Sequence, residues 1–330
     1  SYDLNSLYPH LIMQWNISPE TLDPRSPALF DIDQFIKTPY DRAVFEPVPQ
    51  AFCCAGNGYY FDTTIQGFLP EIMQEKYNTR KAAKAEQKKN EELYEKAKDK
   101  KYKVLAAKHK NIQSAMKVQL NSAYGALGSE YFRLYDIRLA EAITLSGQLA
   151  IKWIIDRVNR FMNKTLGTTA VDYIIASDTD SIYVNFKPLV DIVNDGQDLC
   201  PEAIVEAINQ FSKAKVEPFI AKRYKELAQI TNCVENKMDM GREKISEKGI
   251  WTAKKRYILN VWDNEGVRYT EPKLAMTGIE TVRSSTPEKC RDALKECLKL
   301  IMNSDESTVQ KYISEFKEKF RGFEFGDISS

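Results

Sequence analysis

The sequence has no long apolar run, almost no net charge and no cysteines in a C-x-x-C spacing. No stretch of about 18 consecutive apolar residues occurs, which argues against a membrane-spanning helix. The formal net charge of the 330 residues is +1, so overall charge does not indicate a nucleic-acid partner. The six cysteines include no C-x-x-C pair, which argues against a structural zinc or iron–sulfur site and favours reduced thiols.

The charge that is present is unevenly distributed along the chain. Residues 80–110 contain twelve Lys or Arg against five Asp or Glu. Two long helices, predicted at about 69–100 and 103–124, carry this excess, and for most of these lysines we expect a solvated charged face. The apolar share of 43% is ordinary, and the length is sufficient for two or three domains with a core.

The remaining pattern predicts a mixture of helices and hairpins. A short strand over 1–5 is followed by a helix that starts near Ser6. The segment 18–66 looks irregular, "YGALGS" (124–129) looks like a glycine-punctuated turn, and Gly147 predicts close packing of a helix against a sheet. Further helices are predicted at 136–163, 201–228, 287–303 (with Thr286 as N-cap) and 306–321, and hairpins at 171–186 and 251–271 with "DNEG" as the second turn.

Acidic residues stand at two points where strands are expected to end. Asp178 and Asp180 in "SDTDS" would sit at a hairpin tip and converge on one point, as hard divalent cations require. A lone D-x-D turn also occurs for local hydrogen bonding. Asp3 likewise ends a β-rich run where the chain turns, so it could meet the other two at one sheet edge. Three convergent carboxylates are the usual seat of a two-metal phosphoryl-transfer site.

Two further features suit an anion. Ser6, Leu7 and Tyr8 would lie at a helix N-terminus, where free N–H groups suit a triphosphate. The alternative is an ordinary strand-to-helix turn.

The basic helices offer the second feature. Lys117, Asn121 and Tyr124 are spaced to share one helix face, and Arg80 and Lys84 share a face of the other helix. If the two helices pair as an antiparallel hairpin, the three cations can point at one anion.

The run "TAKKRYILNV" places Lys254, Lys255, Arg256 and Tyr257 on a predicted strand. Strand alternation would send Lys255 and Tyr257 to the same face. A cation and an aromatic ring on one face suit a nucleic-acid backbone. The alternative is an exposed edge strand protected by lysines.

These motifs occur in the order of a known family. "DLNSLYP", "KVQLNSAYG" and "SDTDSIYV" resemble motifs A, B and C of family B DNA polymerases, and "KKRY" resembles the K-x-Y element of that family. "NISPET", "YGALGS" and "EPKLAMTGIETVRSSTP" are similar to the replicative polymerases of T-even-like tailed phages. The resemblance covers essentially the whole chain. His10 departs from it, because many members have serine there.

The resemblance implies an α+β fold with three parts. An antiparallel-sheet palm backed by helices would comprise 1–66 and 130–278, helical-hairpin fingers 67–129, and a partial helical thumb 279–330. On the same basis we expect the chain to lack the family's N-terminal region with a 3′–5′ exonuclease before Asp3 and its clamp-binding tail after the thumb. The partners expected on this basis are an N-terminal polymerase/exonuclease fragment and, through the missing C-terminal tail, a sliding clamp.

The resemblance also implies a reaction, which is template-directed addition of dNTPs to a primer 3′-OH with two Mg²⁺ ions. Asp3 and Asp180 would bridge the ions, Asp178 would support them, and the carbonyl of Leu4 would be a ligand. Glu243 is a further acidic candidate near the metals. The expected setting is phage DNA replication in the cytoplasm of the infected bacterial host, with no membrane association.

The remaining site residues receive roles on the same basis. The amides of Ser6 and Leu7 would hold phosphate, and Tyr8 would lie under the sugar and reject a 2′-OH. The other predicted contacts are Arg80, Lys84 and Lys117 to the triphosphate (with Lys117 protonating pyrophosphate), Asn121 and Tyr124 to the nascent base pair, and Lys255, Arg256 and Tyr257 to primer–template DNA.

Two other functions remain open from the sequence. The chain could be a non-catalytic DNA-binding subunit or remnant of a split polymerase, although its intact carboxylates argue against decay. It could also be a metal-dependent nuclease that uses the same three aspartates. The paired basic helices and Tyr8 favour a nucleoside-triphosphate site instead.

Overall fold

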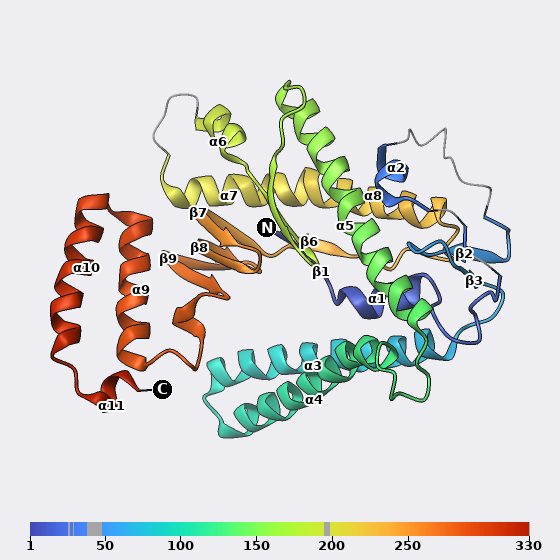
Figure 1. Ribbon diagram of the computed structural model, residues 1–330, viewed down its shortest axis with the longest axis horizontal. Helices are drawn as coiled ribbons and strands as arrows, with labels where there is room; N and C mark the ends of the chain where they lie inside the picture. The colour runs from blue at the N-terminus through green and yellow to red at the C-terminus, as the bar shows by residue number, and fades with distance from the viewer. Residues whose placement is uncertain (26, 29, 38–47, 195–198, 330) are drawn as a thin grey trace. The chain divides into compact units, whose positions relative to one another are not determined.

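The computed structural model describes residues 1–25, 27–28, 30–37, 48–194 and 199–329 (Figure 1). The chain divides into two compact units. The larger unit consists of Tyr2–Pro188 and Lys213–Gly241, and the smaller unit of Ser1, Leu189–Ser212 and Arg242–Ser330. Helices and antiparallel sheets are mixed throughout, which confirms the predicted α+β class. The palm, fingers and thumb boundaries stay predictions.

The larger unit contains a four-stranded sheet with the strand order β4-β5-β1-β6. Its strands are β1 (Tyr2–Leu4), β4 (Ile174–Asp178), β5 (Ser181–Val184) and β6 (Met240–Arg242). β5 pairs antiparallel with both β4 and β1, so the predicted hairpin at 171–186 is confirmed and the first strand is joined to it. The first strand of the chain, which carries Asp3, and the strand that follows Asp180 are therefore hydrogen-bonded neighbours.

The core of the larger unit forms around one long helix. The helices of this unit are α1 (Leu7–Gln14), α2 (Ile32–Lys37), α3 (Phe68–Ala97), α4 (Lys100–Leu127), α5 (Ile137–Leu166) and α8 (Glu217–Ile230). α5 buries a continuous apolar face that includes Ile143 and Ile154, and α1 and α8 both pack against it. The nearest side chain to a Cβ at Gly147 would be Leu11 on α1, at 3.2 Å. The prediction that Gly147 packs against a sheet is therefore wrong, because its close neighbour is a helix.

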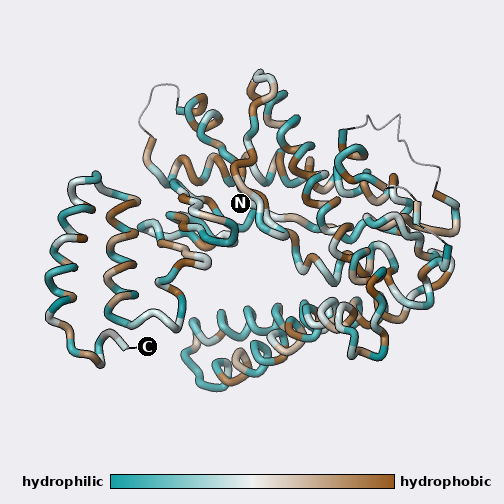
Figure 2. The backbone as a smooth tube through the Cα atoms, viewed as in Figure 1, coloured by the Kyte–Doolittle hydropathy of each residue, from teal (hydrophilic) through white to brown (hydrophobic). Residues whose placement is uncertain are grey.

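Helices α3 and α4 form the expected hairpin and lie side by side (Figure 1). The helix break falls at Lys98, which has φ 51°, and Asp99, whose side chain accepts a hydrogen bond from the backbone of Lys101. Figure 2 shows this hairpin as largely hydrophilic. The predicted turn at 124–129 is wrong, since α4 continues to Leu127 with Gly125 inside it. The burial of Leu127 favours continuation of the helix past Gly125, despite the low helix propensity of glycine.

The segment predicted as irregular contains short regular elements. A small hairpin is formed by β2 (Phe52–Cys54) and β3 (Tyr60–Asp62), in addition to α2. Trp15, which is fully buried, donates from Nε1 to the carbonyl of Cys54 at 2.9 Å and ties this hairpin to the end of α1. Strands of three residues are too short to produce a periodic pattern in the sequence. Residues 38–47 lie outside the described residues.

The smaller unit is built on a three-stranded antiparallel sheet in the order β7-β8-β9. Its elements are α6 (Lys187–Asn194, whose first two residues belong to the larger unit), α7 (Pro201–Phe211), β7 (Lys244–Ala253), β8 (Arg256–Asn264), β9 (Val267–Thr277), a 3₁₀ turn (Glu280–Val282), α9 (Glu288–Asn303), α10 (Glu306–Arg321) and α11 (Phe325–Ile328). The "DNEG" turn between β8 and β9 is confirmed. The two C-terminal helices are also confirmed, although the N-cap of α9 is Pro287 and not Thr286.

The predicted helix at 201–228 is confirmed as one long helical stretch. It comprises α7, a π-helical turn at Ser212–Val216 and α8. The π-helical turn falls where the chain passes between the two units. Within the described ranges, no helix is both long and apolar enough to cross a membrane.

A buried ion pair anchors the sheet of the smaller unit. Asp263 on β8 is 1% exposed and pairs with Arg242 and with Arg268, whose Nε lies 3.1 Å from its carboxylate. Burial alone would raise the pKa of Asp263, but hydrogen bonds from Arg242 and from the backbone of Gly266 hold that pKa below its ordinary value. This carboxylate therefore stays charged within the unit.

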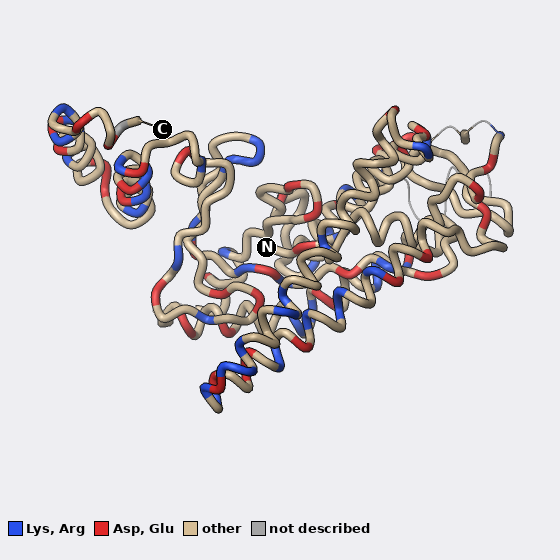
Figure 3. The backbone as a smooth tube through the Cα atoms, turned by 90° about the horizontal axis from the view of Figure 1, so that it is seen from below, with Lys and Arg blue, Asp and Glu red and all other residues tan. Residues whose placement is uncertain are grey.

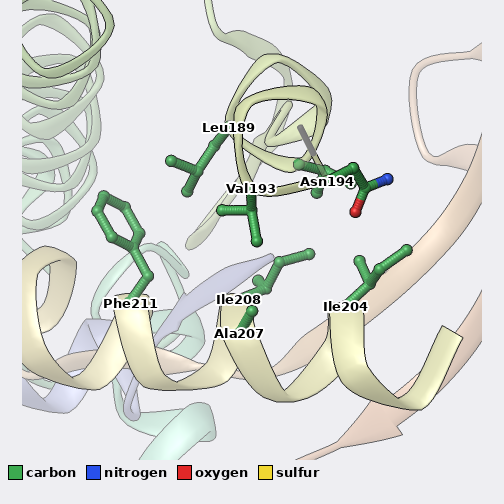
Figure 4. Close-up of a pocket in the computed structure, with 8 residues that line it drawn as sticks. Leu189, Val193, Asn194, Ile204, Ala207, Ile208 and Phe211 are labelled. Carbon is green, nitrogen blue, oxygen red and sulfur yellow. The ribbon is translucent and has the colours of Figure 1, made fainter. Parts of the chain in front are cut away.

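An apolar pocket separates α6 from α7 (Figure 4). Leu189 and Val193 of α6 face Ile204, Ile208 and Phe211 of α7 across a cavity of about 60 Å³. No charged side chain lines it. The pocket thus lacks the groups that acid–base or phosphoryl chemistry would need.

We expect a matched pair of glycine substitutions to separate close packing from helix propensity. A Cβ at Gly56 would lie 2.5 Å from the backbone carbon of Leu145 on α5, so Gly56→Ala should cost about 2–3 kcal/mol of unfolding free energy. A Cβ at Gly125 would meet nothing within 4 Å, so Gly125→Ala should stabilise α4 by about 0.5–1 kcal/mol. Guanidinium unfolding of both variants checks this. A Gly56→Ala protein as stable as the wild type would contradict the close approach to α5.

Candidate active site

The turn between β4 and β5 carries two of the candidate carboxylates. Thr179 adopts φ 55° at the tip, and the amide of Asp180 donates to the carbonyl of Asp178 at 2.6 Å. The hydroxyl of Ser181 also donates to that carbonyl, at 3.2 Å. The turn is thus fixed by its own backbone, and both carboxylates are held at the same end of the hairpin.

Strand β1 brings the third carboxylate to the same end. Asp3 lies opposite Ser181 across the β1–β5 ladder, and Ser181 lies opposite Asp178 across the β5–β4 ladder. The amide of Leu4 donates to the carbonyl of Asp180 at 2.8 Å. Asp3, Asp178 and Asp180 therefore gather at one end of three adjacent strands. Among the described residues, however, no group of three or more His, Cys, Asp or Glu side chains is arranged to hold a metal ion.

The chain turns directly from this strand into helix α1. Ser6 occupies the N-cap position in a left-handed conformation, φ 51° and ψ 55°, with no side-chain cap hydrogen bond. Leu7 and Tyr8 form the first helical turn, as the sequence predicts. The first-turn N–H groups of a helix have no intrahelical acceptors, so this turn presents donors close to the ladder end that carries Asp3.

Helix α3 contacts the same turn through two residues one helical turn apart. Arg80 donates from Nη1 to the hydroxyl of Ser6 at 2.7 Å. Asn5 donates from Nδ2 to the hydroxyl of Tyr77, also at 2.7 Å. The ring of Tyr77 in turn meets His10 edge-on, with ring centroids 4.5 Å apart. Helix α3 is therefore held against the strand-to-helix turn by these side-chain contacts.

Helix α4 reaches the turn through an aromatic pair. The rings of Tyr8 and Tyr124 lie 4.7 Å apart, tilted by 35°. Burial, followed by the neighbouring Tyr124 and the carboxylate of Asp180, raises the pKa of Tyr8. The aromatic pair therefore joins α4 to the first turn of α1.

The remaining candidates of the hairpin are exposed. Lys84, Lys117 and Asn121 present their side chains to solvent, and Lys117 and Asn121 share the side of α4 that carries Tyr124. Neither lysine forms a hydrogen bond or ion pair with another described residue. The structure therefore brings Arg80 and Tyr124 onto the α1 turn, but not the whole predicted cation group.

Lys255, Arg256, Tyr257 and Glu243 belong to the smaller unit. The expectation that Lys255 and Tyr257 share a strand face is wrong, because Lys254 and Lys255 form the turn between β7 and β8 and Lys255 has φ 60°. Tyr257 lies in β8 with its ring 6.2 Å from that of Trp251. Arg256 pairs with Glu280, and Glu243 with Lys244. β8 is the central strand, so it is not the exposed edge considered as the alternative.

Asn5, Tyr77 and His10 were not among the predicted site residues. Tyr77 stands three positions before Arg80, a spacing that places both on one face of a helix. That signal was available in the sequence. The partner of each residue was not, because these hydrogen bonds join Asn5 and Ser6, just before α1, to a helix about seventy residues away.

The chain belongs to the family B DNA polymerases. The sequence profile described as DNA polymerase family B matches residues 2–218, which include β1, the α3–α4 hairpin and the β4–β5 turn. The prediction of a T-even-like member of this family is confirmed by the similarities that follow.

The similarity to two phage proteins extends over the whole chain. It is 34% identical to the DNA-directed DNA polymerase of Enterobacteria phage T4 and 35% identical to that of Escherichia phage RB69. All of this chain is covered in both cases, against 41% of each relative. The chain therefore spans about two fifths of the length of these relatives. It is also 26% identical to the DNA polymerase delta catalytic subunit of Candida albicans, over 95% of the chain and 25% of that protein.

We expect His10 to make folding stability depend on pH. Burial lowers its pKa from 6.5, and the hydrogen bond with the carbonyl of Ser6 and the carboxylate of Asp239 oppose only part of this effect, while Lys237 adds to it. The folded state therefore binds a proton less readily than the unfolded state, so stability is full above about pH 6.5 and is lost as the pH falls through the lowered pKa.

The measurement compares unfolding free energies at pH 7.5 and 5.5 in the wild type and in His10→Ser. All other titrating groups are common to both proteins. The wild type should lose more stability on acidification. An equal loss in the two proteins would show that His10 titrates normally.

Proposed function

We propose that this chain carries a polymerase active site and catalyses template-directed DNA synthesis, in which a dNTP is added to a primer 3′-OH and pyrophosphate is released. One observation carries the proposal. Three aspartates share one end of the β4-β5-β1 ladder, and the adjoining helix N-terminus is contacted by Arg80. Carboxylates beside an anion-binding turn are the combination that phosphoryl transfer needs. Membership of family B supports the same reaction.

The donor atoms at the ladder end suit Mg²⁺. Carboxylate and carbonyl oxygens are its preferred ligands, and Mg²⁺ usually takes one or two carboxylates together with substrate phosphates. Asp3, Asp180 and the carbonyl of Leu4 would hold two ions, with Asp178 in support. When bound, the ions would make the primer hydroxyl more acidic and neutralise charge on the phosphates.

The protein's own groups would bind and orient the nucleotide. The amides of Ser6 and Leu7 would receive the triphosphate, and Arg80 would exchange its hydrogen bond with Ser6 for one with a phosphate oxygen. Lys84 and Lys117, both exposed, would add positive charge, and Lys117 would give a proton to the departing pyrophosphate.

The aromatic pair, Tyr8 and Tyr124, would contact the sugar and the base of the incoming nucleotide. Tyr8 would pack beneath the sugar and leave no room for a 2′-hydroxyl, and its contact with Tyr124 would keep the ring in place. Asn121 would lie next to Tyr124 along the nascent base pair. Lys255, Arg256 and Tyr257 would hold the primer end, and Glu243 would be an auxiliary acid.

The proposed setting is phage DNA replication in the cytoplasm of the infected bacterium. The palm, fingers and thumb would follow the boundaries predicted from the sequence. A primer-extension assay with and without dNTPs tests the reaction. Extension supports a polymerase, shortening of the primer without dNTPs indicates a nuclease, and retention of the primer without change indicates a binding subunit.

We expect Asp180→Asn to lower primer extension by at least about a thousandfold, because it removes a metal ligand from the proposed site. Binding of primer–template should be largely unchanged, since no phosphate contact is lost. Asp33→Asn, at an exposed carboxylate paired with Lys152, is the matched control and should retain activity. An Asp180→Asn protein that extends primers at the wild-type rate would rule out this assignment.

We expect Tyr8→Ala to admit ribonucleotides at least about tenfold more readily, because exclusion of an added hydroxyl here is steric and requires the ring. Tyr8→Phe keeps the ring and its contact with Tyr124, so it should keep most of the selectivity. Single-turnover incorporation of matched dNTP and rNTP pairs measures the ratio. Unchanged selectivity in Tyr8→Ala would place the ring away from the sugar.

A further inference from the structure

The charged side chains of helix α4 are all basic. From Lys100 to Leu127 it contains six lysines and no aspartate or glutamate. Helix α3 is different, because it contains both glutamates and lysines. Ion pairs form between Lys76 and Glu75, between Lys89 and Glu86, and between the C-cap residue Lys98 and Glu95. Within the described part of the chain, the lysines of α4 form no ion pair. Figure 3 shows basic positions recurring along this hairpin.

Three of these lysines lie in one line. Lys103, Lys110 and Lys117 are seven residues apart, so they differ by only about 20° around the helix and by about 10 Å along it. We call them the lysine strip. All three are exposed. Lys103 lies 6.0 Å from the ring centroid of Tyr94, a contact that leaves its charge unneutralised.

The lysine strip leads to the candidate active site. The next residue at the same spacing is Tyr124, whose ring lies 4.7 Å from that of Tyr8 at the start of α1. The buried residues of α4, which include Ala106 and Leu120, lie on a different face of the helix. The strip therefore continues from the site along the open side of the hairpin.

We propose that the lysine strip binds the phosphate backbone of single-stranded DNA. Exposed lysines at regular intervals, with no acidic partner, can neutralise the phosphates of a nucleic acid. The counterions of those phosphates are then released on binding. Solubility alone does not require a row of lysines without acidic residues, because a surface of mixed charges, such as that of α3, is sufficient. The inference concerns DNA binding without nucleotide, and its test leaves in place Lys117, which the proposed function also assigns to the triphosphate.

The straight course of the strip favours a single strand over a duplex. From Lys103 to Lys117 the strip is about 21 Å long. The phosphates of a duplex wind around its axis, so a rigid duplex meets a straight line of lysines at few points. A single strand is flexible and can place successive phosphates along the whole line.

The test is the affinity of the complete chain for a labelled oligo(dT) of 30 nucleotides, followed by fluorescence anisotropy over a range of salt concentrations. The solution contains EDTA and no dNTP, so the measurement is independent of catalysis. Lys103→Gln/Lys110→Gln removes two charges of the strip and leaves Lys117 in place. Lys101→Gln/Lys108→Gln is the matched control, because it removes two lysines at the same spacing from nearly the opposite side of α4.

The strip variant should bind oligo(dT) about tenfold more weakly at low salt, and the slope of log affinity against log salt should fall by about 1.4. The control should change affinity by less than about twofold. Binding of a blunt duplex should be affected much less than binding of oligo(dT). Equal losses of oligo(dT) affinity in the two variants would overturn the proposal, because the effect would then come from net charge alone. A larger loss of affinity for the blunt duplex than for oligo(dT) would also overturn it, because the strip would then bind duplex DNA.

Discussion

The backbone ladder that joins β4, β5 and β1 is the constraint on which the candidate site depends. The hydrogen bond from Leu4 to Asp180 and the register of Asp3 opposite Ser181 place carboxylates from distant parts of the chain at one strand end. Side chains alternate between the two faces of a strand, so a slip of one residue in β1 would turn Asp3 to the other face. The phosphoryl-transfer chemistry that we propose therefore relies on main-chain pairing before any side chain is considered.

The turn that follows β1 transmits this constraint to the helical hairpin. Because the chain passes from strand to helix at Ser6, the start of α1 stays next to the carboxylates. Arg80 and Tyr77 attach α3 to this turn, and Tyr124 attaches α4 through Tyr8. The bases of both helices are thus fixed by short-range contacts, while their outer parts remain polar and exposed. This arrangement leaves the lysines of α4 available to a ligand, whereas those of α3 partly pair with neighbouring glutamates.

The sequence by itself determined the elements that have a long or strong local pattern. The apolar periodicity of α5, the acidic hairpin of β4 and β5, the long helices α3 and α4, and the turn between β8 and β9 were all predicted, because each depends on residues close together in the chain. The order of the motifs also predicted the family. Patterns failed where elements were short, as in β2 and β3, or where tertiary packing outweighed a local preference, as at Gly125.

Only the tertiary structure decided which residues meet. The pairing of β1 with β5 and the contacts of Tyr77 with Asn5 and His10 join segments that no local pattern connects. The turn conformation of Lys255 likewise depends on the pairing of β7 with β8, which a single run of residues does not reveal. Local sequence determines helices, strands and charge, because these follow from neighbouring side chains and backbone preferences. Register and contact follow from the packing of distant segments, because the free energy of burying apolar surface belongs to the assembled core rather than to any one segment.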